Sequence, residues 1–84
     1  MHEWVLPHRV GVGDVIERGG QPAVITRLVT EPDGSGVIRA LRADGTPQRW
    51  EWPPGVAPSL LSRLGRHCRP TPEGLRDFLA WQVA

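Results

Sequence analysis

A basic segment in the last third of the chain carries the residues best suited to contacting phosphate. Between positions 58 and 71 the sequence has Arg63, Arg66 and Arg69, one histidine and no acidic residue. Residues 1–55 hold six arginines and seven acidic residues, a net charge of −1, so the remaining residues carry +2. Guanidinium groups bind phosphate oxygens without regard to base sequence. This asymmetry predicts a phosphate-contacting edge; the alternative is a solvated linker between helices.

A second candidate is an aromatic strand. Trp50 and Trp52 are two positions apart, which places both on one face of a strand. Arg39, Arg42 and Arg49 lie on this strand or its expected neighbour. Indole rings flanked by guanidinium groups can stack on unpaired bases, and they can also form a groove for an extended or proline-rich peptide. The remaining alternative is that both tryptophans lie in the core.

The sequence predicts no catalytic residue, no metal site and no cofactor. Cys68 follows His67, but adjacent side chains rarely point at each other, and no acidic residue nearby could orient the pair. The possible metal ligands His2, His8, His67 and Cys68 lack paired metal-binding spacing. A single cysteine excludes an intrachain disulfide and suits a reducing cytoplasm. We therefore expect an unreactive thiol and a protein that is not an enzyme.

Residues 10–56 have the pattern of a small antiparallel barrel. Short apolar runs alternate with glycine-bearing turns at Gly19-Gly20, residues 32–36 and Asp44-Gly45. The second run is rich in β-branched residues and apolar on two faces, with Val24 and Leu28 expected on one and Ile25 and Val29 on the other. The expected strands are Asp14–Arg18, Ala23–Thr30, Val37–Arg42 and Gln48–Trp52.

Residues 57–84 are expected to form a helical appendix. Leu60, Leu61 and Leu64 suggest a short helix that Ser59 caps and Gly65 ends, with a fifth strand over Leu60–Leu64 as the competing interpretation. A firmer helix begins at Thr71-Pro72-Glu73. Its apolar stripe would cover the barrel or bind a partner, and consists of Leu75, Phe78, Leu79 and Val83, with Trp81 at its flank.

The 84 residues are enough for one small domain with shallow rather than deep sites. Trp4, within residues 1–9, is expected to be packed in an edge strand or arm. All ten basic residues are arginine, a bias typical of GC-rich bacterial genomes. No apolar run is long enough to span a membrane, and MHEWVLPHR lacks the features of a signal peptide. We expect a cytoplasmic protein.

The run GDVIERGGQPAVITRL followed by GVIRALRADGTPQRWEWPPG resembles the SH3-like small barrels of bacteria, including KOW- and Tudor-type modules. The resemblance rests on the GD-plus-apolar first strand, the GG hairpin and the strand–DG–strand return. It implies a barrel of four or five strands, here followed by a C-terminal amphipathic helix. Barrels of this kind bind nucleic acid or peptides, or serve as assembly modules.

Together these features predict a non-catalytic binding module. The leading hypothesis is nucleic-acid binding through the basic segment and the aromatic strand, with contacts from Arg63, Arg66, Arg69, Trp50, Trp52, Arg39 and Arg42. The alternative is a protein-interaction or assembly module, a homodimer included, that binds through Leu75, Phe78, Leu79 and Trp81.

Overall fold

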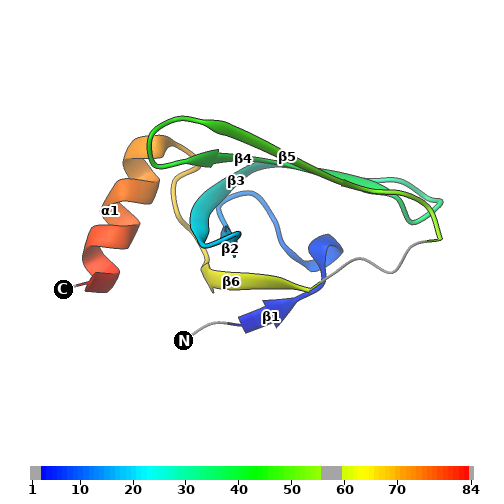
Figure 1. The fold of residues 1–84 in the computed structure, drawn as a ribbon, viewed down its shortest axis with the longest axis horizontal. Coiled ribbons are helices and arrows are strands. Elements are labelled where there is room, and N and C mark those ends of the chain that lie inside the picture. Colours follow the sequence, from blue (N-terminus) through cyan, green and yellow to red (C-terminus); the bar gives the residue numbers. More distant parts are fainter. Residues whose placement is uncertain (1–2, 56–59, 84) are drawn as a thin grey trace.

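The computed structural model describes residues 3–55 and 60–83. One six-stranded sheet, a 3-10 turn and one helix make up the fold (Figure 1). Every strand pairing is antiparallel, in the order β1-β6-β2-β3-β4-β5. The elements are β1 (Glu3–Val5), η1 (Pro7–Arg9), β2 (Val15–Arg18), β3 (Gln21–Thr30), β4 (Gly36–Arg42), β5 (Pro47–Trp52), β6 (Leu61–Gly65) and α1 (Pro72–Val83).

The mainly β class and the C-terminal helix are confirmed, but the sheet has six strands and is not closed into a barrel. It bends so that β1 and β5 face one core, to which Val5 and Trp52 both contribute. Among the described residues, no ladder joins these two edge strands. Pro47 begins β5 and Pro53 follows it, and proline has no N–H to donate to a further strand.

The helix expected around Leu60, Leu61 and Leu64 is wrong, and the competing strand is confirmed. Leu61–Gly65 form β6, which pairs with β1 on one side and β2 on the other. Leu61 packs in one core and Leu64 against the other. A spacing of three suits one face of a helix or opposite faces of a strand, and the two neighbouring strands select the second. Ser59, the expected cap, lies outside the described residues.

Two apolar clusters lie on opposite faces of the sheet. The inner cluster is formed by Val5, Val10, Ile16, Ile25, Ile38, Trp52 and Leu61. The outer cluster consists of Val15, Val24, Cys68 and Leu75, and it attaches α1 to the sheet. The first part of β3, from Ala23 to Ile25, is therefore covered on both faces, as its sequence predicts.

A β-bulge in β3 changes which residues share a face. Ile25 pairs with Ala40 and Arg27 pairs with Arg39, so Thr26 is an extra residue on β3. Beyond this point the alternation reverses, and Leu28 joins Ile25 at the inner cluster. The sequence predicts that Ile25 shares a face with Val29, and Val24 with Leu28. This prediction is therefore wrong.

Helix α1 begins as the sequence predicts. The Thr71 hydroxyl accepts a hydrogen bond from the Gly74 N–H at 2.9 Å, and the Thr71 carbonyl accepts one from the Leu75 N–H at 3.0 Å. Leu75 is fully buried in the outer cluster. At the other end of the chain the expected edge strand forms as β1, but the expected packing of Trp4 is wrong, because this residue is 65% exposed.

Gly13 joins three parts of the chain. Its N–H donates to the Ile25 carbonyl, and its carbonyl accepts from the Cys68 N–H, both at 2.9 Å. Its φ is +93°, and an added Cβ would lie 2.9 Å from the Cys68 carbonyl oxygen. Gly34 has nearly the same φ, +89°, but open space around it. The two glycines therefore separate backbone strain from steric overlap.

We expect Gly34→Ala to lower the free energy of unfolding by about 1 kcal/mol, the cost of a left-handed alanine. Gly13→Ala is expected to cost about 3 kcal/mol, because overlap with Cys68 adds the penalty of over-packing. Urea unfolding followed by tryptophan fluorescence measures both. If both variants lose the same free energy of unfolding, the close approach of Cys68 to Gly13 contributes nothing beyond backbone strain.

Candidate nucleic-acid interface

Arg63, the first arginine of the predicted basic segment, is buried rather than presented to solvent. Only 5% of its side chain is exposed. One guanidinium nitrogen forms an ion pair with Glu3, and the other lies 3.6 Å from the Asp14 carboxylate. Asp14 is itself buried and accepts a hydrogen bond from the Gly11 N–H at 3.0 Å. Arg63 is therefore a structural residue and is not positioned to contact phosphate.

Arg66 and Arg69 are exposed, but carboxylates lie near both. Arg66 is 4.0 Å from Asp14, and Arg69 forms an ion pair with Asp77 of α1 at 3.4 Å. The structure does not bring the three arginines of the basic segment together on one surface. Their positive charge is largely balanced within the fold.

Trp50 and Trp52 lie on the core side of β5. Trp52 is buried, its indole N–H donates to the Gly34 carbonyl at 2.8 Å, and its ring lies against Gly36. Trp50 is half-buried against the inner cluster, with the Arg18 guanidinium 5.4 Å from its ring centroid. Of the interpretations that the sequence left open, the one that places both tryptophans in the core therefore fits the structure. Helix α1 covers neither of them. They do not form an open stacking surface.

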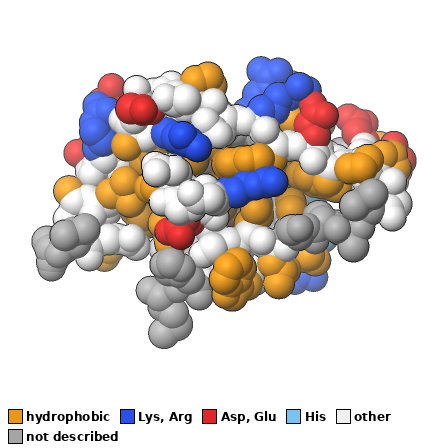
Figure 2. All heavy atoms as spheres, viewed as in Figure 1, with side chains coloured by type: hydrophobic (Ala, Val, Ile, Leu, Met, Phe, Trp, Pro, Cys, Tyr) orange, Lys and Arg blue, Asp and Glu red, His pale blue; other side chains and the backbone are white. Residues whose placement is uncertain are grey.

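Three arginines on neighbouring strands lie side by side on the surface of the sheet. Arg27 of β3 pairs directly with Arg39 of β4, and Arg39 pairs with Arg49 of β5. All three side chains are exposed. We call Arg27, Arg39 and Arg49 the arginine row. Figure 2 shows basic side chains over β4 and β5 along the upper edge of the view, with acidic side chains beside them.

The arginine row is only partly neutralised. Arg49 forms an ion pair with Glu51 at 2.5 Å, whereas Arg27 and Arg39 have no ion pair with any described residue. Like charges directly opposite each other on adjacent strands repel and destabilise a sheet. An anion bound across the row would remove this repulsion. The row is therefore the best electrostatic candidate for a ligand site.

Of the three arginines that the sequence places on or beside the aromatic strand, Arg39 and Arg49 belong to the row and Arg42 does not. Arg42 is three positions further along β4, so it lies on the opposite face and is half-buried. Arg27 was not predicted, although the turns contain the signal. Arg39 and Arg49 are each five positions from Asp44, and Arg27 and Arg39 are each six positions from Asp33, at the centres of the two hairpin turns. Residues equidistant from a turn face each other.

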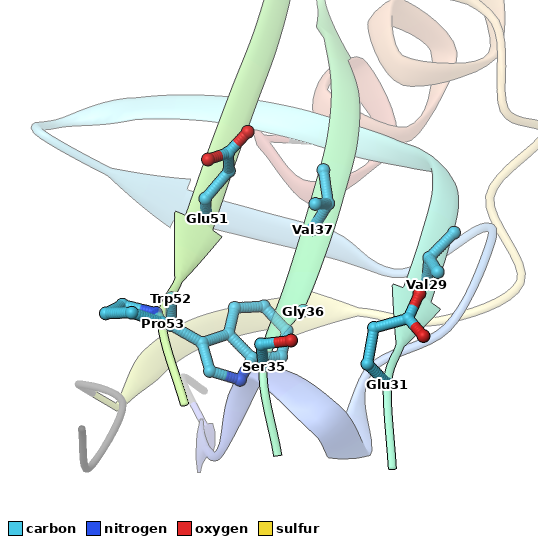
Figure 3. Close-up of a pocket in the computed structure, with 8 residues that line it drawn as sticks. All are labelled: Val29, Glu31, Ser35, Gly36, Val37, Glu51, Trp52 and Pro53. Carbon is cyan, nitrogen blue, oxygen red and sulfur yellow. The ribbon is translucent and has the colours of Figure 1, made fainter. Parts of the chain in front are cut away.

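A shallow pocket of about 490 Å³ lies beside the row, where β3 and β5 end and β4 begins (Figure 3). Val29, Val37 and Glu51 form the adjacent cross-strand row, since Val29 pairs with Val37 and Val37 with Glu51. Each is two positions from an arginine of the row, about 7 Å along its strand. The pocket is lined by Val29, Glu31, Ser35, Gly36, Val37, Glu51, Trp52 and Pro53.

The stripe of α1 is mostly packed against the sheet. Leu75 is fully buried, and Phe78 and Leu79 lie against the outer cluster. Trp81 points away from it and is 77% exposed. Of the four residues expected to bind a partner, Trp81 alone is widely accessible.

The residues with possible catalytic or metal-binding chemistry are dispersed. Burial raises the pKa of the Cys68 thiol, which favours the unreactive protonated form. His8 and His67 are exposed, and His2 lies outside the described residues. Within residues 3–55 and 60–83, no group of three histidine, cysteine or acidic side chains could hold a metal ion. No helix in the same ranges is long and apolar enough to cross a membrane.

Comparison of the chain with protein-family models, with curated proteins and with solved structures finds no match. The exposed charges and the pocket beside them are therefore the basis for assigning a function.

The Glu3–Arg63 pair makes stability depend on pH. The Glu3 carboxylate accepts a hydrogen bond from the Arg63 guanidinium, and this bond lowers the pKa of Glu3 from the ordinary value of 4.5. A carboxylate whose pKa is lowered by folding stabilises the protein above its unfolded pKa, and this contribution disappears as the pH falls through the folded pKa. We expect Glu3→Gln to be less stable than the wild type at pH 7, with the difference vanishing in acid below pH 4.5.

Urea midpoints at a series of pH values measure this difference. Glu73→Gln, on the exposed face of α1, is the control for removal of one surface carboxylate. A difference between wild type and Glu3→Gln that stays constant with pH would rule out the ion pair as its source.

Proposed function

We propose that this protein is a non-catalytic nucleic-acid-binding module that contacts phosphates with the arginine row. The observation that carries the proposal is the direct cross-strand alignment of Arg27, Arg39 and Arg49, of which the first two have no ion pair among the described residues. Evenly spaced guanidinium groups suit a polymer of evenly spaced phosphates better than a single small anion.

The dimensions of the row support a polymeric ligand. Two interstrand spacings of about 4.8 Å give a row roughly 10 Å long. Phosphates of one strand of a duplex follow at about 3.4 Å along the helix axis, and those of an extended chain are further apart, so the row is long enough to contact more than one phosphate. The sheet surface is shallow, which suits an extended chain lying across it.

The resemblance to SH3-like barrels of the KOW and Tudor type is part of this proposal. The small antiparallel sheet, bent around one core and followed by a helix, is compatible with a barrel-like fold. Modules of that class bind nucleic acid or protein. The open sheet departs from the closed barrel, and the row on its outer face favours nucleic acid.

Replacing Arg27 and Arg39 together with glutamine is expected to lower affinity for single-stranded oligonucleotides of all sequences by roughly tenfold or more at ~50 mM salt. The slope of log affinity against log salt is expected to become shallower by about 1.4, because two phosphate contacts are lost at ~0.7 each. Fluorescence anisotropy with labelled oligonucleotides measures both quantities. The variant is expected to fold at least as stably as the wild type, since like-charge repulsion is removed.

The matched control is Arg66→Gln with Arg69→Gln, which removes the same charge from the basic segment. We expect this pair to weaken binding far less. If the control pair causes the larger loss, the basic segment rather than the arginine row is the contact surface. If the wild type binds neither single- nor double-stranded oligonucleotides at ~50 mM salt, nucleic-acid binding is wrong.

A second candidate function is protein assembly, and the exposure of Trp81 favours it. An indole that is 77% exposed on a helix is a typical anchor of a protein interface. The rest of the helical stripe is occupied by the sheet, so a partner would bind around Trp81 and not along the whole stripe.

We expect Trp81→Ser to leave folding intact, because the side chain contributes to neither apolar cluster. Phe78→Ala is the contrasting variant, since its ring lies against Gly65 and its loss is expected to destabilise the fold. Sedimentation velocity measures association. If the wild type is a dimer that Trp81→Ser converts to a folded monomer, assembly becomes the leading function; a monomeric wild type would rule out self-association.

A further inference from the structure

We infer that the pocket beside the arginine row receives one unstacked base of a single-stranded nucleic acid, with preference for bases that carry an exocyclic amino group. This inference rests on the proposed function and names the form of nucleic acid that the same surface binds. It follows from the position of the pocket, the chemistry of its lining and the charge on each side of it.

The pocket lies where the base of a phosphate-bound nucleotide would reach. Arg39 and Val37 are two positions apart on β4, and Arg27 and Val29 have the same relation on β3. Both valines therefore share the face of the row at about 7 Å from it, a distance that one nucleotide can bridge between phosphate and base. A base in a duplex is stacked and paired, so only an unpaired base could enter.

The lining suits a base better than a phosphate. Val29 and Val37 are half-buried and offer apolar contact to the face of a ring. Glu31 and Glu51 are exposed at the sides of the pocket, and their negative charge would repel a phosphate (Figure 3). The surface thus separates the two parts of a nucleotide, with phosphate at the arginines and base at the valines.

The two glutamates also select among bases. Carboxylates accept hydrogen bonds and donate none, so they pair with the amino group of cytosine or adenine. Thymine and uracil have no exocyclic amino group. Glu51 is already engaged with Arg49, whereas Glu31 has no ion pair with any described residue. We therefore assign the main selective contact to Glu31.

The test measures the affinity of the protein for three ligands by fluorescence anisotropy at ~50 mM salt. They are oligo-dC and oligo-dT of about 15 nucleotides each, and a mixed-sequence duplex of the same length. The wild type is expected to bind oligo-dC roughly tenfold more tightly than oligo-dT, the effect of one hydrogen bond to a charged acceptor. Glu31→Gln is expected to remove most of this preference. The amide oxygen of glutamine can still accept a hydrogen bond from the base. Glu31→Ala is therefore the second variant, and it is expected to abolish the preference for oligo-dC.

Glu73→Gln is the control, since it removes the same charge from the surface of α1. Removing a carboxylate strengthens binding of every oligonucleotide alike, so the ratio of the two affinities isolates the contact from the charge. The control is expected to leave that ratio unchanged.

The outcomes separate this inference from the function on which it rests. If no oligonucleotide binds, the proposed function itself fails. If oligo-dC and oligo-dT bind equally, or their ratio is the same in wild type and both Glu31 variants, the base pocket is wrong while phosphate binding stands. Binding of the duplex as tightly as oligo-dC would also overturn it.

Discussion

The fold depends on the junction at Gly13 and Asp14, where backbone hydrogen bonds and a buried ion pair meet. Gly13 bonds to Ile25 of β3 and to Cys68 ahead of α1. Asp14 places its carboxylate beside Arg63 of β6, within the fold. A positive φ and a close backbone approach are both required here, and only glycine meets them without strain. This two-residue unit links β3, β6 and the segment before the helix.

The bulge at Thr26 has an equally local cause and a wider consequence. One extra residue in β3 reverses the alternation of side chains beyond it. Ile25 and Leu28 therefore both reach the inner cluster, although they lie three positions apart. Arg27 lies on the turn side of the bulge, and its pairing with Arg39 is set by the turn around Asp33.

The distribution of ion pairs decides which arginines can serve a ligand. Arg63 and Arg69 have carboxylate partners that tie β6 to β1 and the linker to α1. Arg27 and Arg39 have none among the described residues, and both are exposed. Within the basic segment, Arg63 is therefore a buried structural residue, while Arg27 and Arg39, which are dispersed in the sequence, form an exposed surface.

Local sequence was enough to predict the mainly β class, the positions of the hairpin turns, the apolar character of both faces at the start of β3 and the first residues of α1. These features depend on local periodicity, glycine turns and helix capping, all of which short segments express. That Leu61–Gly65 form a strand and that Trp50 and Trp52 face the core became clear only from the three-dimensional structure. Each of these depends on strand register and on neighbours distant in the chain, because a single-residue shift exchanges the two faces of a strand.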